Sequence, residues 1–367
     1  MLFDFTIKLI LAGALLGMVL NLAGLLTWVE RKQSAVMQDR IGANRAKIVF
    51  PKRLFPLNWL VWLPNELGLF HSLADAVKMF LKEDFVPRGA DRFLHTLAPA
   101  ISVVFALMAF AAIPFGDTLH VGNHVINLQV ADINVGILFI FAMLGLGVYG
   151  VILAGFSSNN NYAYLGGMRA ASQMLSYEIT MGISIMGVVI AYGTLSLQEI
   201  VRGQAQVWGI FTQPLAFFLF MTAALAETKR VPFDLPEGES EIIGYFVEYS
   251  GMKFGMFFLT DLIETVLVAC LMTTFFLGGW QVPFLQPDGF HFPGGGLWQL
   301  SHPTVITLGV LSFMFKVAFF NWLFMAIRWT LPRFRYDQLM HLGWKILFPA
   351  SLVNVLITSI IVVGCRL

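Results

Sequence analysis

Apolar stretches long enough to cross a membrane alternate with polar loops along this chain. A bilayer core of about 30 Å requires roughly 20 apolar residues in a helix. Eight stretches meet or approach this length, the fifth being the shortest: 7–28, 97–115, 133–156, 175–192, 211–226, 254–278, 304–329 and 346–364. The pattern predicts an all-α, polytopic membrane protein with about eight transmembrane helices, in which residues 1–367 form a single integral membrane domain.

The composition supports this class and limits the chemistry. Hydrophobic residues make up 57% of the chain and charged residues 12%, about half the charged fraction of soluble domains. Its two cysteines, Cys270 and Cys365, are far apart, and the seven histidines fall in loops or at span edges. Neither a disulfide framework nor a zinc, iron–sulfur or haem site is therefore indicated. We expect this chain alone to bind no metal, flavin or haem.

The basic residues are distributed very unequally between the two sets of loops. Loops 29–96, 157–174, 227–253 and 330–345 carry eighteen Lys and Arg residues. The opposite loops, 116–132, 193–210 and 279–303, carry only Arg202. The positive-inside rule places the basic loops in the cytoplasm, so both termini are predicted to be periplasmic.

The first cytoplasmic loop, 29–96, contains a predicted amphipathic helix at 66–82. Its apolar face carries Phe70, Leu73, Val77, Phe80 and Leu81, and its polar face carries His71, Asp75, Lys78 and Lys82. Such a helix lies at the membrane interface or packs on neighbouring subunits, and the pattern leaves both open. Upstream, Arg40 and Arg45 stand in a turn-rich stretch and can grip a carboxylate or the polar head of a ligand.

The acidic loop, 227–253, is tied to the membrane at both ends. It carries three cations and six carboxylates: Glu227, Asp234, Glu237, Glu239, Glu241 and Glu248. Pro232 and Pro236 predict extended or turned backbone at 231–236. Acids gathered beside a low-dielectric medium repel one another, which raises their pKa toward neutrality and lets them exchange protons. The alternative is a solvated acidic loop without such a role.

Four ionisable residues fall inside predicted spans, where charge is costly and usually functional: Glu178, Asp261, Glu264 and Lys316. Glu178 is expected about one turn into the fourth helix, where a helix N-terminus would also favour an acid. Glu264 and Lys316 have similar predicted depths, about 16 and 20 Å from the cytoplasmic helix ends. They are predicted to form an ion pair, the alternative being that each faces a separate aqueous cavity.

Five sequence blocks resemble one known family. The most specific is A-E-T-K-R-V-P-F-D-L-P-E-G-E-S-E at 226–241, followed by E-Y-S-G-M-K at 248–253. The others are W-V-E-R-K at 28–32, D-R-I-G-A-N-R at 39–45, the block 157–178 and the block 328–345. They resemble the H subunit of proton-pumping NADH:quinone oxidoreductase, respiratory complex I, over nearly the whole chain.

The resemblance implies a subunit that forms the membrane-side entrance and part of the wall of a quinone chamber, with an acidic path leading from it. Residues expected at the chamber are Arg40, Arg45, Asp75, Arg230, Phe233 and Asp234. With the span charges included, the proton-coupling candidates are Glu178, Glu227, Asp234, Glu237, Glu239, Glu241, Glu248, Asp261, Glu264 and Lys316. The family usually has Asn where Lys229 stands, so Lys229 is expected to pair with an acid of the loop.

The resemblance also implies the surroundings of the chain. Quinone is the substrate, and NADH, FMN and iron–sulfur clusters belong to partner subunits. The expected partners are hydrophilic quinone-site subunits, adjacent membrane subunits and the lipid bilayer of a bacterial inner membrane, with no nucleic acid. Two alternatives are a related subunit of a membrane-bound hydrogenase and a stand-alone secondary transporter. A transporter predicts internal repeats, and the sequence shows none.

Overall fold

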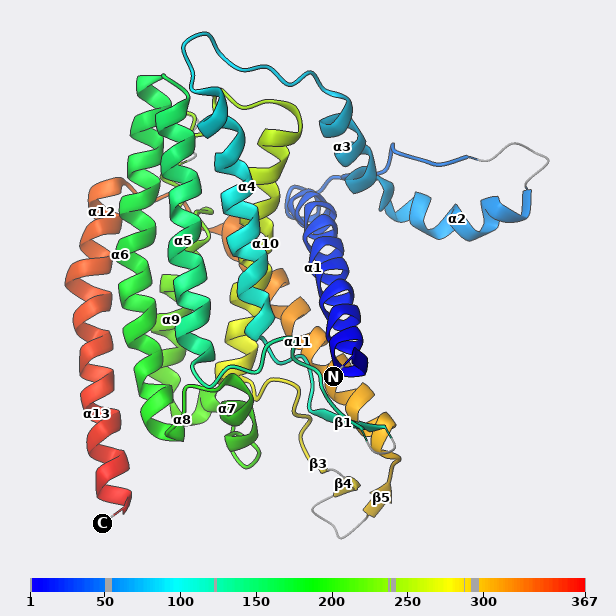
Figure 1. Cartoon of the computed structure of the whole chain (residues 1–367), viewed down its shortest axis with the longest axis vertical. Coiled ribbons are helices and arrows are strands. Elements are labelled where there is room, and N and C mark those ends of the chain that lie inside the picture. Colours follow the sequence, from blue (N-terminus) through cyan, green and yellow to red (C-terminus); the bar gives the residue numbers. More distant parts are fainter. Residues whose placement is uncertain are drawn as a thin grey trace.

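The structure, a computed structural model, describes residues 2–49, 55–121, 124–236, 238, 242–286, 288–291 and 297–366. Among these residues, seven helical segments are long and apolar enough to cross a membrane. They stand side by side in Figure 1 and contain α1 Leu2–Met37, α4 Arg92–Ala109, α5 Gly136–Ser157, α6 Asn161–Tyr192, α10 Gly251–Phe276, α11 His302–Thr330 and α13 Phe348–Arg366. The predicted all-α membrane architecture is confirmed.

The fifth predicted span corresponds to the shorter helix α9, Pro214–Glu227. Its 14 residues rise about 21 Å, less than the thickness of a bilayer core of about 30 Å. A single turn, α8 (Gly209–Thr212), precedes it. In Figure 1 the free ends of α1 and α13 lie at the same end of the bundle, as eight passages of the chain require.

Helix α10 is the centre of the bundle. Every residue from 260 to 276 is buried, and the helix packs against α1, α4, α9 and α11. Its buried hydroxyls are satisfied locally, because each donates to the carbonyl four residues earlier in the same helix: Thr260, Thr265, Thr273 and Thr274. Polar residues can therefore occupy this helix without partners elsewhere.

Helix α6 begins fourteen residues before the predicted start of the fourth span, at Asn161. The Asn160 side chain caps it by accepting from the Tyr162 N–H. Its first turns are polar, but Ser172 and Ser176 donate to carbonyls of their own helix. Glu178 therefore lies mid-helix, about 26 Å from the first residue, and the expected position one turn into the helix is wrong.

Two helices lie outside the bundle at one end, which we call the α3 end. Helix α3, Phe70–Leu81, has no buried residue and contacts α1 and α10, so the predicted amphipathic helix is confirmed. Helix α2, Phe55–Leu67, was not predicted and projects away from the bundle in Figure 1. The chain turns between them at Gly68, where φ is +74° and a Cβ atom would collide with the Ala43 carbonyl oxygen. Only glycine fits that turn.

Short strands mark the opposite end, which we call the strand end. Strands β1 (Thr118–Val121) and β2 (His124–Asn127) form an antiparallel hairpin, with Thr118 opposite Asn127. Strands β3 (Leu285–Gln286), β4 (Gly289–His291) and β5 (Leu297–Gln299) form an antiparallel sheet. Helix α7 (Leu197–Gly203) lies beside them in Figure 1. At the α3 end, α12 (Tyr336–His341) and a π-helical turn (Leu342–Leu347) lead into α13.

Candidate functional site

A cavity of about 920 Å³ lies between α1, α3 and α10 at the α3 end, a volume typical of ligand pockets. Its walls are mostly apolar: Leu20, Phe80, Phe254, Phe258, Leu259, Leu262 and Trp329. Ionisable side chains also line it: Glu30, Arg31, Arg40, Asp75, Lys78 and Lys82. The cavity therefore suits a ligand with a polar head and a long apolar portion.

Helix α3 is fixed over this cavity by polar contacts to α1. Arg31 Nη2 lies 2.6 Å from Asp75 Oδ2. The Thr27 and Ser72 hydroxyl oxygens are 2.7 Å apart. Asp75 is therefore held at the cavity by a guanidinium of α1, and this ion pair joins two elements that meet only at the site.

Glu30 connects the cavity wall to the acidic loop. Its carboxylate accepts two guanidinium groups, with Arg230 Nη1 at 3.2 Å and Arg328 Nη1 at 2.7 Å. Arg230 also lies over the ring of Phe258, which lines the cavity, at 5.8 Å from the ring centre. Glu30 thus gathers α1, α11 and the loop after α9 at one point of the wall.

Lys229, the neighbour of Arg230, points into the bundle. Its Nζ lies 3.0 Å from Asp261 Oδ1 and 3.2 Å from Glu264 Oε2, and its side chain is 2% exposed. Burial alone would lower the pKa of Lys229, but Asp261 and Glu264 hold it well above its usual value. The expected pairing of Lys229 with a loop acid is wrong. Its left-handed backbone, with φ of +55°, turns the chain at this point, and α10 supplies both acids three residues apart.

Glu227, at the end of α9, is the next acid in this direction. It is 1% exposed, and neither carboxyl oxygen has a hydrogen-bond partner among the described residues. The charged groups whose fields act on it are Glu178, Glu264 and Lys229. Glu178 Oε1 in turn faces α5, 3.1 Å from where a Cβ atom of Gly145 would be. Ionisable groups therefore succeed one another from the cavity wall to the middle of α6.

The loop after α9 is anchored on both sides. The Gln173 side-chain amide of α6 donates to the carbonyls of Ala226 and Phe233, each at 2.7 Å. Phe233 stacks on Phe334 at 5.4 Å between ring centres, and Arg333 Nη2 lies 2.8 Å from Asp234 Oδ2. Residues 231–236 contain no helix, as the two prolines predicted.

The structure distributes the expected chamber residues over three places. Arg40 and Asp75 line the cavity, and Arg230 reaches its wall through Glu30. Phe233 and Asp234 lie in the anchored loop and are not among the lining residues. The other predicted residue, Arg45, has its backbone N–H 3.1 Å from His71 Nε2, to which it donates.

Of the remaining coupling candidates, Glu248 lies near the start of α10, where its Oε1 accepts from the Asn160 amide at 2.7 Å. Lys316 donates to the carbonyls of Leu277, Gly279 and Gln281 at 2.8, 2.9 and 2.6 Å. The predicted Glu264–Lys316 ion pair is therefore wrong.

The physical reason is that α10 ends beside Lys316. The last carbonyls of a helix lack partners within the helix and carry partial negative charge, so they bind an ammonium group. Glu264 has its own cation in Lys229. Glu237, Glu239 and Glu241 lie outside the described residues.

Three residues of the site were not predicted: Glu30, Arg328 and Arg333. Each lies within one of the sequence blocks 28–32 and 328–345. The available signal was a charge at or just beyond the end of an apolar span, where it can face either solvent or another charge. Sequence alone does not reveal that the ends of α1 and α11 converge on the loop after α9.

The family model described as NADH dehydrogenase matches residues 9–359. The chain belongs to the NADH dehydrogenase family. This family member is 44% identical over 354 residues to the NADH-quinone oxidoreductase H subunit 1 of Cytophaga hutchinsonii, covering 96% of this chain and 95% of the relative. It is 43% identical over 357 residues to the NADH-quinone oxidoreductase H subunit 1 of Geobacter metallireducens, covering 97% and 96%. The family expected from the sequence blocks is confirmed.

Proposed function

We propose that this chain is the membrane subunit of an NADH:quinone oxidoreductase that forms part of the quinone-binding chamber and couples quinone reduction to proton translocation. The observation that carries the proposal is the buried series of ionisable groups that begins on the cavity wall at Glu30 and continues to Glu178. The names of the relatives support an NADH-quinone oxidoreductase over a hydrogenase subunit or a transporter.

The cavity matches the chemistry of a quinone. A quinone head has two carbonyl oxygens that accept hydrogen bonds, and Arg31, Arg40 and Lys78 supply donors at the cavity. The isoprenoid tail would lie along the apolar wall formed by Phe254, Phe258 and neighbouring residues. In this proposal Arg45, Phe233 and Asp234 extend the chamber beyond the cavity, toward the surface that partner subunits cover.

Coupling follows from how the charges are shared. Reduction of a quinone to a quinol takes up two protons, so the charge beside the cavity changes during turnover. Glu30 is held by both Arg230 and Arg328, and a change in that balance moves Arg230. Because Lys229 is the next residue along the backbone, the movement reaches Asp261 and Glu264. Interacting acids titrate together, so the change is passed on to Glu227 and Glu178.

The other acids of the loop, Glu237, Glu239, Glu241 and Glu248, complete this path in the proposal. Lys316 stands apart from it, since its ammonium group binds helix carbonyls at the strand end. NADH, FMN and iron–sulfur clusters belong to partner subunits, which include hydrophilic quinone-site subunits and adjacent membrane subunits. The whole lies in a bacterial inner membrane, with the α3 end cytoplasmic and both termini periplasmic.

The test is Glu227→Gln in the assembled complex. Glutamine keeps the size of the side chain, and Glu227 has no hydrogen-bond partner to lose among the described residues, so assembly should survive. Quinone reductase turnover and proton pumping per complex should fall together, because the variant removes the ionisable group between Glu264 and Glu178. Normal values of both would contradict the coupling role.

The matched control is Glu66→Gln. Glu66 is an exposed acid that pairs with Lys47 at 3.0 Å and lies away from the buried series. The same chemical change there should leave turnover and pumping unchanged. If both variants lower activity equally, the loss reflects general damage to the complex.

A further inference from the structure

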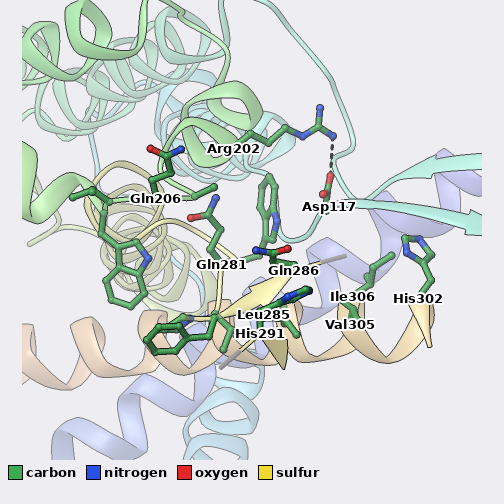
Figure 2. A pocket seen from close by; sticks show the side chains of 18 of the residues that line it. Asp117, Arg202, Gln206, Gln281, Leu285, Gln286, His291, His302, Val305 and Ile306 are labelled. Atoms are coloured by element: carbon green, nitrogen blue, oxygen red, sulfur yellow. Dashed lines mark hydrogen bonds and ion pairs between the residues drawn. The ribbon is translucent and has the colours of Figure 1, made fainter. Parts of the chain in front are cut away.

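A second pocket, of about 800 Å³, lies at the strand end (Figure 2). Its lining comes from α7 and α8, from the segment after α10 and from the first turns of α11. Tryptophans contribute part of the lining, Trp208 and Trp280. None of its lining residues belongs to the proposed quinone cavity. The pocket is thus at the other end of the bundle from the proposed reaction.

The pocket presents one carboxylate and one guanidinium side by side. Arg202 Nη2 lies 2.8 Å from Asp117 Oδ1, and Figure 2 shows this pair at the side of the pocket. The two side chains are 51% and 43% exposed, so each keeps capacity for a further partner. Apart from histidines, they are the ionisable residues among those that line the pocket, and their charges cancel. His291 Nε2 is buried there without a hydrogen-bond partner in the described part of the chain.

An apolar strip leads away from the pocket along the bundle surface. Phe211, a lining residue, is 74% exposed. Leu215 and Phe218 follow it and are three residues apart on one face of α9, both exposed. In a membrane protein such side chains meet lipid tails, and tryptophans are enriched at the level of the lipid head groups. The pocket therefore combines a polar head site with an apolar path into the membrane.

We infer that this pocket binds a zwitterionic phospholipid with a primary ammonium, of the phosphatidylethanolamine class. Its phosphate would pair with Arg202 and its ammonium with Asp117, so the lipid head presents the opposite charges to the protein pair. One acyl chain would follow Phe211, Leu215 and Phe218. His291 Nε2 would supply a further polar contact to the head group.

The charges distinguish this lipid from others. An anionic phosphatidylglycerol offers no cation to Asp117 and brings its phosphate close to that carboxylate. Phosphatidylcholine carries a cation, but its quaternary ammonium has no N–H to donate. Charge-assisted hydrogen bonds are stronger than neutral ones, so the primary ammonium gains an interaction with Asp117 that the other two heads lack.

The experiment uses the whole complex in nanodiscs. Phosphatidylethanolamine, phosphatidylglycerol or phosphatidylcholine, each with a diazirine in one acyl chain, is added at equal amounts and photolysed. Cross-links are then mapped to peptides. Phosphatidylethanolamine should label the peptide that contains Phe211, Leu215 and Phe218 about tenfold more than either other lipid.

The variants Arg202→Gln and Asp117→Asn each lower this labelling about tenfold, and Asp117→Asn also removes the preference over phosphatidylcholine. Lys47→Gln with Glu66→Gln is the matched control, because that pair is similarly exposed but lies at the α3 end, and it leaves labelling unchanged. Equal labelling by phosphatidylglycerol, no labelling at this peptide, or unchanged labelling in both pocket variants would overturn the proposal.

Discussion

Replacing Lys229 by methionine should destabilise the protein severely. Methionine fills a similar volume but leaves Asp261 and Glu264 without their cation. Both acids lie within 3.2 Å of Lys229 Nζ, and their side chains are almost fully buried. Removing one partner of a buried ion pair typically costs about 3–5 kcal/mol. Since two acids lose the same partner, we expect the upper part of that range, about 5 kcal/mol.

A compensated variant separates charge from packing. Buried charges can often be replaced together at little cost, whereas removing only one partner is costly. The triple variant Lys229→Met, Asp261→Asn, Glu264→Gln should therefore recover most of the loss, to within about 2 kcal/mol of the wild type. Lys47→Met is the control, because the exposed Lys47–Glu66 pair should contribute less than about 1 kcal/mol.

The assay is the fraction of intact complex that remains in solubilised membranes across a temperature series. Lys229→Met should lower the temperature of half-loss strongly, the triple variant only slightly, and Lys47→Met hardly at all. If Lys229→Met behaves like Lys47→Met, or if the triple variant is worse than the single one, the charges at Lys229 do not balance as described.

The pH dependence of this ion-paired cluster follows from the raised pKa of Lys229. A raised folded-state pKa contributes stability that is complete below the ordinary lysine pKa of about 10.4. That contribution is lost only as the pH rises through the raised value. The ammonium of Lys229 should therefore remain charged between about pH 6 and 9. Loss of wild-type stability in that window, absent from the triple variant, would contradict this assignment.

Three further outcomes are expected. Losses of thermal stability in Lys316→Met and Glu264→Gln should add to within about 0.5 kcal/mol in the double variant, because the two residues share no partner. Burial raises the pKa of Tyr249 to about 12, so Tyr249→Phe should cost about 1 kcal/mol, the hydrogen bond to Ser157. This cost should be constant from about pH 7 to 10 in the same melting assay, since the raised pKa keeps the phenol neutral there. Cys365 should react with a membrane-impermeant maleimide added to the periplasmic side, and reaction only after lysis would refute the proposed orientation.

Hydropathy predicted the positions of the spans because the need for about 20 apolar residues acts on each helix separately. It did not predict the start of α6, where Ser172, Gln173 and Ser176 lower the hydropathy. Those residues bond to their own helix or to the loop after α9, so the helix does not depend on an apolar sequence there. The short strands at the strand end were missed because two to four residues are too few to show an alternating pattern.

The partners of the buried charges were beyond the sequence for a different reason. Counting residues along a helix gives depth, which is one coordinate, while a contact also depends on rotation and tilt. Glu264 and Lys316 have similar predicted depths, yet Lys316 binds the carbonyls at the end of α10. Lys229 was assigned to a loop, and its left-handed backbone directs it instead to acids of α10. Charge type was predictable, and charge pairing required the fold.

The short length of α9 has a consequence for how the protein is made. A segment of 14 residues ending in Glu227 is a poor candidate for independent partitioning from the translocation machinery into lipid. Helix α9 packs against α6, α10 and α13, two of which are synthesised after it. Its insertion should therefore be completed only when the later helices emerge, so that Glu227 reaches its buried position by assembly of helices rather than by crossing lipid alone.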